Sequence, residues 1–270
     1  MPIPHLLTPQ VFDRGSAIPQ TEQVFDSCVL GVDPGVSALG LAAVGRQGRK
    51  PVLLFADTVR TPSDLPDDRL QSLAHSMNAD ERDAVLRAYV GDRGNRRHKP
   101  GRAFERTGYR FDVLCDYGAF RDLQRHRLLT LEWQRLSPEH GFDTPEVIAD
   151  AGMTQEWTRV MEDSAATWGT LSEHAGEDVA QYAVAMAYRI RFVMQMSARE
   201  AMHLIELRSS PQGHPTYRRI AQQMHELIDR TAGHRAIAST MTYLDTSDVD
   251  LERLEAERRA EAKRKAARAG

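Results

Sequence analysis

Cysteines, net charge and long hydrophobic runs are all scarce in this sequence, and each scarcity excludes a class of protein. The 270 residues include two cysteines, Cys28 and Cys115, which lack the close spacing of a zinc site and the density of a disulfide scaffold. No stretch approaches the roughly 18 apolar residues of a membrane span. The first residues, MPIPHLLTPQVFDRG, lack the basic start and apolar core of a secretory signal. We therefore expect a cytoplasmic protein with reduced thiols, no metal site and no membrane partner.

The charge balance gives no sign of a polyanionic partner. Lys and Arg number 35 against 38 Asp and Glu, which gives a formal net charge of -3. A hydrophobic fraction of 41% beside 27% charged residues is ordinary for a globular chain that buries a sizeable core. We therefore expect no nucleic-acid partner, and any site for an anion must be local.

The chain changes character near residue 78. Before that point, Gly, Pro and polar residues separate three short apolar runs, which predict a β-meander within residues 28–60: CVLGVD, GLAAV and PVLLFADTV. After it, apolar spacing predicts helices over 154–175, 177–207 and 217–231, and the alternating YRFDVL predicts a strand over 109–114. The end of the chain is almost all charge and alanine, which predicts a solvated helical tail. We expect an α+β protein in three parts: 1–77, 78–235 and 236–270.

An aspartate ends the first predicted strand. The stretch VLGVDPGVSALGLAAV places Asp33 before a Pro-Gly turn, where a carboxylate can hold a magnesium ion. With DTVRTPSDLPDDRLQSL, it resembles the opening of the crossover-junction endonucleases, Holliday-junction resolvases with a ribonuclease-H-like fold, over residues 29–73. That resemblance implies a magnesium-dependent nuclease whose metal ligands come from distant parts of the chain. Because we find no later segment with the partner carboxylates, we interpret Asp33 as a relic or a turn residue and keep the nuclease as an alternative.

Three cationic or protonatable residues, Arg125, His126 and Arg127, stand side by side in QRHRLLTLEWQRLS. Like charges at this spacing repel one another unless an anion lies between them, and guanidinium groups offer fixed pairs of donors that match phosphate oxygens. The triplet therefore indicates a phosphate-binding site. A solvated helix face is the alternative interpretation.

From residue 78 to about residue 235 the chain resembles the flavin-dependent thymidylate synthases. The resemblance rests on the triplet, which follows a strand in that family, and on three arginines at the family's spacing: Arg191, Arg199 and Arg208. It implies a mostly helical domain with a small sheet, preceded here by the short ribonuclease-H-like meander. It also implies reductive methylation of dUMP to dTMP with FAD, methylenetetrahydrofolate and NADPH, in a homo-oligomer whose sites draw on several subunits.

The resemblance assigns roles to individual residues. It implies that Arg191 and Arg208 face deoxyuridylate, with Arg208 near the pyrimidine ring as the catalytic residue and Arg135 at a further substrate position. The flavin side comprises His98 in HKPGRAFE, Arg125, His126, Arg127, Arg199, His203 and, with a small insertion, His214. FAD and a nucleotide carry several negative charges, so permanently charged donors suit such a pocket. Taken singly, each arginine could instead pair with a neighbouring acid on the surface.

The sequence departs from the family pattern around the triplet. Where the family has Ser, Asn, Glu, Ser and Arg, this chain has Thr130, Glu132, Trp133, Arg135 and Ser137, and Asp122 replaces a glutamine ahead of the triplet. A carboxylate beside a phosphate is repulsive unless an arginine neutralises it. These departures keep a second hypothesis open, a catalytically degenerate member that serves as a flavin-binding or scaffold subunit. The magnesium-dependent nuclease is the third.

Overall fold

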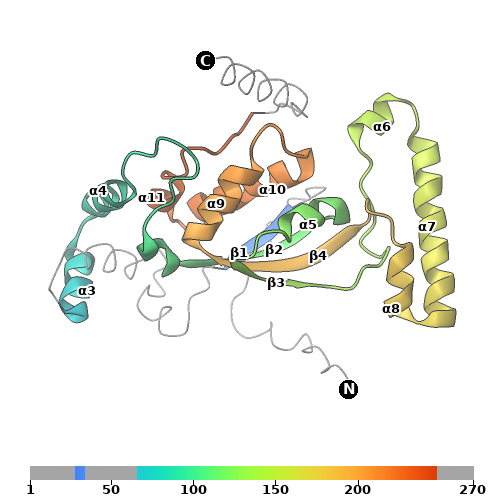
Figure 1. Cartoon of the computed structure of the whole chain (residues 1–270), viewed down its shortest axis with the longest axis horizontal. Coiled ribbons are helices and arrows are strands. Elements are labelled where there is room, and N and C mark those ends of the chain that lie inside the picture. Colours follow the sequence, from blue (N-terminus) through green and yellow to red (C-terminus); the bar gives the residue numbers. More distant parts are fainter. Residues whose placement is uncertain (1–27, 34–65, 248–270) are drawn as a thin grey trace, which may run out of the picture.

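A small antiparallel sheet forms the centre of the molecule (Figure 1). The structure is a computed structural model, and it describes residues 28–33 and 66–247. The strands are β1 (Cys28–Asp33), β2 (Gly108–Asp116), β3 (Leu129–Trp133) and β4 (Arg189–Ser197). They lie in the order β1-β2-β4-β3. The two central strands pair from Gly108 opposite Ser197 to Asp116 opposite Arg189, so segments about 80 residues apart in sequence meet there.

Alternation of side chains gives the central strands one buried and one more exposed face. The buried side chains are Tyr109, Phe111, Val113 and Cys115 on β2 and Ile190, Phe192, Met194 and Met196 on β4. A period of two residues is what a strand with one covered face requires. The intervening residues, Arg191 among them, therefore point to the opposite face of the sheet.

Three helices cover the buried face of the sheet (Figure 1). They are α5 (Tyr117–Leu123), α9 (Ala198–Arg208) and α10 (Pro215–Glu226). Their apolar side chains join those of β2 and β4 in the main hydrophobic core. The described helices leave the other face of the sheet uncovered, so we call the two sides the covered face and the open face.

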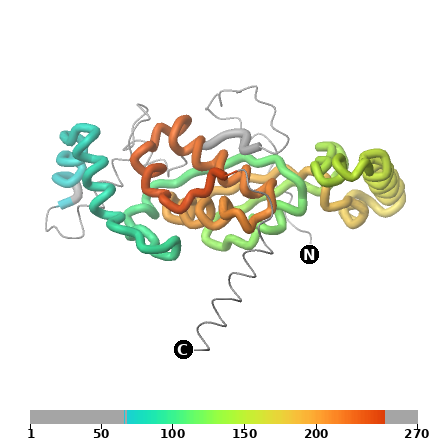
Figure 2. Tube along the Cα trace, turned by 90° about the horizontal axis from the view of Figure 1, so that it is seen from above, coloured from blue at the N-terminus to red at the C-terminus, as the bar shows by residue number. Residues whose placement is uncertain are grey.

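The remaining helices extend the molecule at both ends of the sheet (Figure 2). At one end lie α3 (Asp67–Ser76) and α4 (Ala79–Val90), and at the other α6 (Glu146–Asp150), α7 (Thr154–Ala175) and α8 (Glu177–Ala180). The short elements are η2 (Arg102–Glu105), η3 (Gln181–Ala183), the π-helical η4 (Leu227–Thr231) and α11 (Arg235–Ala238). Among the described helices, none combines the length and the apolar character needed to cross a membrane.

Several sequence-based predictions are confirmed. The α+β class with a small sheet holds, as do the strands at 28–33 and 109–114 and the helix over 154–175, while the predicted helix over 217–231 is α10 followed by a π-helical turn. Near residue 78, α4 begins with a capping box, in which Asn78 and Glu81 each accept a hydrogen bond from the other's backbone N–H, at 3.0 and 2.8 Å. The division of the chain into three parts stays a prediction. The other two strands of the meander lie outside the described residues.

Two predictions about local structure are wrong. The expected helix over 177–207 is interrupted by β4, because alternation of apolar and polar residues in RIRFVMQMS matches a strand between two partners. The triplet follows α5 rather than a strand and lies in the turn before β3. In addition, Ile237, Ala238 and Met241 pack in the core although the sequence places them in the charged tail. The tail beyond residue 247 lies outside the described residues.

Candidate functional site

Helix α9 carries three of the predicted site residues: Arg199, His203 and Arg208. The helix follows β4 without a loop, and the Ser197 hydroxyl caps it by accepting a hydrogen bond from the backbone N–H of Glu200 at 3.3 Å. Because the central strand holds the first turn of α9, the side chains of this helix have fixed positions over the covered face.

His126 connects the triplet to α9. Its buried ring lies with Nδ1 at 3.2 Å from Glu200 Oε1, and its Nε2 accepts a hydrogen bond from Arg208 Nε at 3.0 Å. A guanidinium group can only donate, so Nε2 has a free lone pair and Nδ1 carries the proton that faces Glu200. The two contacts therefore select one neutral tautomer of His126.

Arg208 is enclosed by groups from the end of α5 and from α10. Its Nη2 donates to the backbone carbonyl of Asp122, its Nη1 lies 3.7 Å from Asp122 Oδ1, and its guanidinium lies 5.2 Å from the centre of the Tyr217 ring. Only 13% of the side chain is exposed. Asp122, which replaces the family's glutamine, thus pairs with the arginine at the predicted catalytic position.

His203 lies on α9, three residues after Glu200, and its ring faces that of His126. The two rings are 5.7 Å apart, edge to face. Burial lowers the pKa of His203, the positive charge of Lys99 lowers it further, and the negative charge of Glu200 opposes both. His203 is therefore neutral at pH 7, and its ring nitrogen can act as an acceptor or as a metal ligand.

The loop over residues 91–101 runs along α9 and brings His98 to this side of the molecule. Arg199 fastens the end of that loop, because its Nε donates to the carbonyl of Pro100 at 2.9 Å and its Nη1 lies 3.1 Å from Glu105. The His98 ring pairs with the side chain of Asn95 within the loop, at 2.8 Å. Arg199 thus borders the His126 cluster from α9, His98 lies in the adjoining loop, and each has a partner within the chain.

A buried ion pair anchors the start of the same loop. Both terminal nitrogens of the Arg93 guanidinium bond to the Glu206 carboxylate, at 2.5 and 2.6 Å, and the two side chains are only 4% and 0% exposed. The Tyr243 hydroxyl donates to the Arg93 carbonyl, and the Tyr243 backbone N–H donates to Glu206. The loop, α9 and the last described segment are therefore joined through one ion pair.

The remaining flavin-side residues lie at the edge of this cluster. Arg125 and Arg127 are exposed in the turn, and Arg125 lies 3.3 Å from Asp122. His214 caps α10 by accepting from the backbone N–H of Thr216, with its ring 6.2 Å from Tyr217. The alternative that the triplet is a solvated helix face is wrong, because these residues lie in a turn and His126 is buried.

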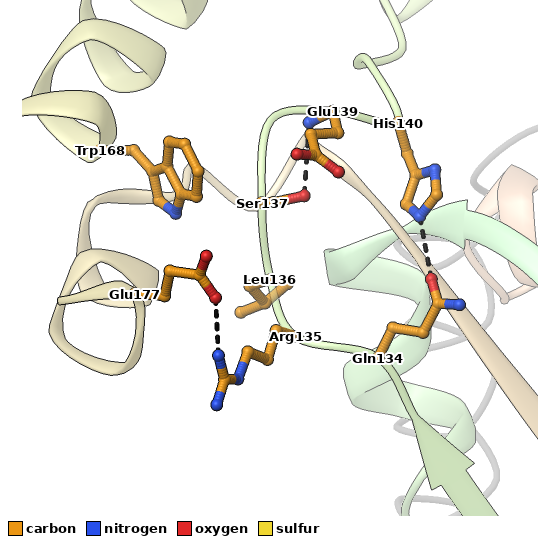
Figure 3. Close-up of a pocket in the computed structure, with 8 residues that line it drawn as sticks. All are labelled: Gln134, Arg135, Leu136, Ser137, Glu139, His140, Trp168 and Glu177. Atoms are coloured by element: carbon orange, nitrogen blue, oxygen red, sulfur yellow. Dashed lines mark hydrogen bonds and ion pairs between the residues drawn. The ribbon is translucent and has the colours of Figure 1, made fainter. Parts of the chain in front are cut away.

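The structure does not bring Arg191 and Arg135 to the cluster. Arg191 lies on the open face, where it forms a two-pronged ion pair with Asp112. Arg135 follows the far end of β3 and pairs with Glu177 at 2.6 Å beside a cavity of about 290 Å³ (Figure 3). Trp168 lines the same cavity, and its buried indole N–H has no hydrogen-bond partner among the residues that the structure describes. One copy of the chain therefore cannot place both residues beside Arg208.

Sequence reasoning missed Glu200 and Tyr217. A Glu and a His three positions apart on a helix point to the same side, so the Glu200–His203 spacing was an available signal.

Asp33 is the last residue of β1, and in the strand register it lies opposite Arg110 of β2. Most of the stretch that resembles an endonuclease lies outside the described residues, and that resemblance stays a prediction.

Two solved structures share this fold. The chain aligns over 71% of its length with a UMP/dUMP methylase, PolB from Streptomyces cacaoi, bound with 5-Br dUMP, at 15% identity, a TM-score of 0.52 and 91% coverage of that protein. It aligns over the same share with thymidylate synthase X from Helicobacter pylori, solved with FAD and dUMP, at 18% identity, a TM-score of 0.50 and 95% coverage. At these identities the likeness shows the fold alone.

Closer relatives are larger proteins. The chain is 40% identical over 189 residues to a UPF0159 protein of Thermoplasma acidophilum, and 40% identical over 178 residues to one of Chlamydia pneumoniae. These matches cover 70% and 66% of this chain but only 38% and 33% of the relatives' own lengths. The model of the thymidylate synthase complementing protein family, Thy1, matches residues 52–232. This match takes in most of the sequence, including β2, β3, β4 and α9, and the chain therefore belongs to the thymidylate synthase complementing protein family.

Proposed function

We propose that this chain binds FAD and deoxyuridylate along α9 and methylates the nucleotide to dTMP with methylenetetrahydrofolate and NADPH. One observation carries the proposal: His126, His203 and Arg208 lie in one cluster, although His126 and Arg208 are 82 residues apart in sequence. The resemblance to the flavin-dependent enzymes selects these same positions. In that resemblance His126 and His203 belong to the flavin side, and Arg208 lies near the pyrimidine ring.

The residues of the cluster suit a flavin dinucleotide. Arg125 and Arg127 are exposed beside His126, and Arg199 is one-third exposed at the other end of the cluster. Guanidinium groups stay charged and match the oxygens of a diphosphate. When bound, FAD supplies the redox chemistry and NADPH the electrons. In this proposal the arginines hold the dinucleotide and the neutral imidazoles of His126 and His203 border its ring.

The catalytic residue of the proposal is Arg208. Its guanidinium carries a permanent positive charge in a largely buried site, where an opposing charge is screened less than in water. Such a group stabilises the negative charge that develops on the pyrimidine during attack by carbon 5. The contact with His126 orients the guanidinium, and the Tyr217 ring supports it from α10.

The proposal includes a homo-oligomer. Arg191 extends from the open face of the sheet and Arg208 ends α9 on the side of the covered face, yet the resemblance has both of them facing the nucleotide. A second copy of the chain, presenting its open face to the first, resolves this conflict. Sedimentation analysis or gel filtration with light scattering tests this part of the proposal, and a monomer that turns over dUMP contradicts it.

Titration of FAD into the purified chain, with and without dUMP, tests the binding step. We expect saturable uptake of flavin in the wild type and binding weaker by about tenfold to a hundredfold in Arg199→Ala, because a hydrogen bond to a charged group contributes about 1.5–3 kcal/mol. Arg235→Ala is the matched control, because Arg235 is exposed and pairs with Asp229 away from the cluster. Absence of flavin uptake by the wild type contradicts the proposal.

A catalytically inactive flavin-binding subunit is the second candidate. It is favoured by the contacts of Arg208, whose guanidinium already bonds to His126 and to the carbonyl of Asp122. It is also favoured by Trp133, which replaces the family's glutamate and is 58% exposed on edge strand β3. This candidate predicts FAD uptake without thymidylate formation, whereas the first predicts both.

A further inference from the structure

Two histidines and a carboxylate converge beneath the first turns of α9. Ligand atoms of His126, Glu200 and His203 all lie within 4.8 Å of one another, and the first two residues are buried. We propose that these three side chains form a binding site for a divalent transition-metal ion. The proposal goes beyond the flavin-dependent function and does not depend on it.

The backbone holds the three side chains in place. Glu200 and His203 are three residues apart on α9, so their side chains extend from the same side of the helix. Pairs of Glu and His at this spacing supply metal ligands in helical carboxylate sites. The third residue comes from the turn after α5, 74 positions before Glu200, and its ring lies edge-on to that of His203.

The chemistry of this donor set suits zinc, cobalt or ferrous iron. Two imidazole nitrogens and one carboxylate oxygen are ligands that these metals share. Three protein ligands leave at least one coordination position open for water or another small ligand. A histidine binds a metal through the lone pair of a ring nitrogen and a glutamate through a carboxylate oxygen, and ligand atoms of all three residues lie within 4.8 Å of one another.

Burial of Glu200 is the second argument. The residue is 5% exposed, and its Oε1 lies 3.2 Å from Nδ1 of the His126 imidazole. A buried carboxylate is costly unless a cation or several hydrogen bonds compensate it. A metal ion bound between Glu200 and the two histidines would supply that positive charge.

Nearby positive charges shape the site. Lys99 and Arg96 both act on His203, and Arg208 contacts His126. They oppose a bare cation and favour an anion, such as hydroxide or a phosphate oxygen, at the open coordination position. Metal on Nδ1 of His126 moves the imidazole proton to Nε2, which then cannot accept from Arg208. Metal binding therefore breaks the Arg208–His126 contact.

The test is a titration of the flavin-free full chain, after treatment with a chelator, with Co²⁺ and then Zn²⁺. We expect one ion per chain, visible absorption bands of nitrogen- and oxygen-bound cobalt, and displacement of cobalt by zinc. Glu200→Gln and His203→Gln should each weaken binding at least tenfold. His174→Gln should bind as the wild type does, because His174 is exposed on α7. Arg208→Ala should bind at least as tightly as the wild type, because it removes a competing contact and a positive charge.

Circular dichroism of each variant separates lost ligation from lost folding, and His203→Gln, at a half-buried position, remains informative if Glu200→Gln does not fold. No cobalt binding by the wild type, or equal affinity in folded His203→Gln, overturns the proposal. A wild type that binds cobalt but takes up no FAD supports the metal site and contradicts the flavin-dependent function. The two proposals can therefore fail separately.

Discussion

The two faces of the central sheet hold their charged side chains in different environments. On the covered face, Arg93 and Glu206 form an ion pair that is almost completely buried. On the open face, the side chains of Arg191 and Asp112 form a pair of similar geometry but remain 42% and 26% exposed. Removing a charge from water is costly, so the covered pair must be completely bonded, whereas solvent weakens the interaction within the exposed pair.

The two ion pairs show that arginines and acidic residues can serve stability on one face of the sheet and remain available for function on the other. Around α9 the buried charges link the fold to the candidate site, because Glu206 and His203 lie one turn apart on the same helix. Substitution on the covered face should therefore affect stability and activity together. Substitution on the open face should leave stability nearly unchanged, and any loss of function there points to a ligand or to a second copy of the chain.

The largest effect on stability is expected when the buried Arg93–Glu206 ion pair loses one partner. Glu206→Ala leaves the Arg93 guanidinium buried without its carboxylate, and we expect a loss of about 3–5 kcal/mol in the free energy of unfolding. Urea denaturation at pH 7 measures it. The double variant Arg93→Met with Glu206→Leu is the control and should recover most of the loss, because no charge stays buried. A loss below about 1 kcal/mol in Glu206→Ala would falsify the assignment of this pair as structural.

Acid should destabilise the covered face through His234. Burial lowers the pKa of His234 to about 4, and its Nδ1 lies 2.9 Å from the Tyr109 hydroxyl. In the unfolded chain the pKa is about 6.5, so the unfolded state binds a proton first as the pH falls. The stability contribution is complete above pH 6.5 and falls by about 3 kcal/mol between pH 6.5 and 4.

Urea midpoints at several pH values in that window, for the wild type and for His234→Gln, measure this effect. The variant removes the titrating group, so its midpoint should vary less with pH than that of the wild type. Parallel curves for the two proteins contradict the prediction.

Arg208→Ala tests the step from structure to catalysis. The variant removes positive charge from the place where negative charge develops, and we expect turnover to fall about a hundredfold, which corresponds to about 3 kcal/mol. FAD affinity should change little, because the interaction is made mainly in the transition state. Thymidylate formation with NADPH and methylenetetrahydrofolate is the assay, and Arg199→Ala, which should lose FAD affinity instead, is the comparison. Equal rates in wild type and Arg208→Ala rule out the catalytic role.

The smallest effect on stability is expected on the open face. Arg191→Ala breaks a half-exposed ion pair with Asp112, and such pairs contribute less than about 1 kcal/mol. If Arg191 of one copy faces the nucleotide of another, the KM for dUMP should still rise about tenfold. Urea denaturation and steady-state kinetics on the same preparation measure both quantities. An unchanged KM shows that the open face takes no part in nucleotide binding.

Local sequence patterns predicted much of the fold but not β4, the strand that carries Arg191 and leads into α9. The alternation of YRFDVL and the apolar spacing over 154–175 are local signals, and both elements formed as expected. The β4 segment is flanked by helix-forming residues, and its pairing partners lie far away in sequence, so a helix over 177–207 was the simpler interpretation. In a strand these residues alternate between the two faces, so Arg191 points to the open face while its neighbours Ile190 and Phe192 point into the core.

The candidate site was predictable in part. The triplet and the spacing of three arginines selected His126 and Arg208, which do meet. The Glu200–His203 spacing on α9 was a local signal, but it says nothing about His126, which approaches the helix from 74 residues earlier. Arg135 was assigned by its position after the triplet, yet a five-residue strand separates the two, so they lie at opposite ends of β3.

The continuity of β4 and α9 restricts how related chains can change in length. Each residue added to a helix rotates everything after it by about 100°. An insertion after His203 would therefore turn Glu206 away from Arg93 and Arg208 away from His126, which removes the buried pair and the candidate catalytic contact in one event. The turn between Arg208 and the His214 cap carries no such constraint from the helix. Across descendants of a common ancestor, we expect insertions and deletions to accumulate in that turn and to be purged from α9.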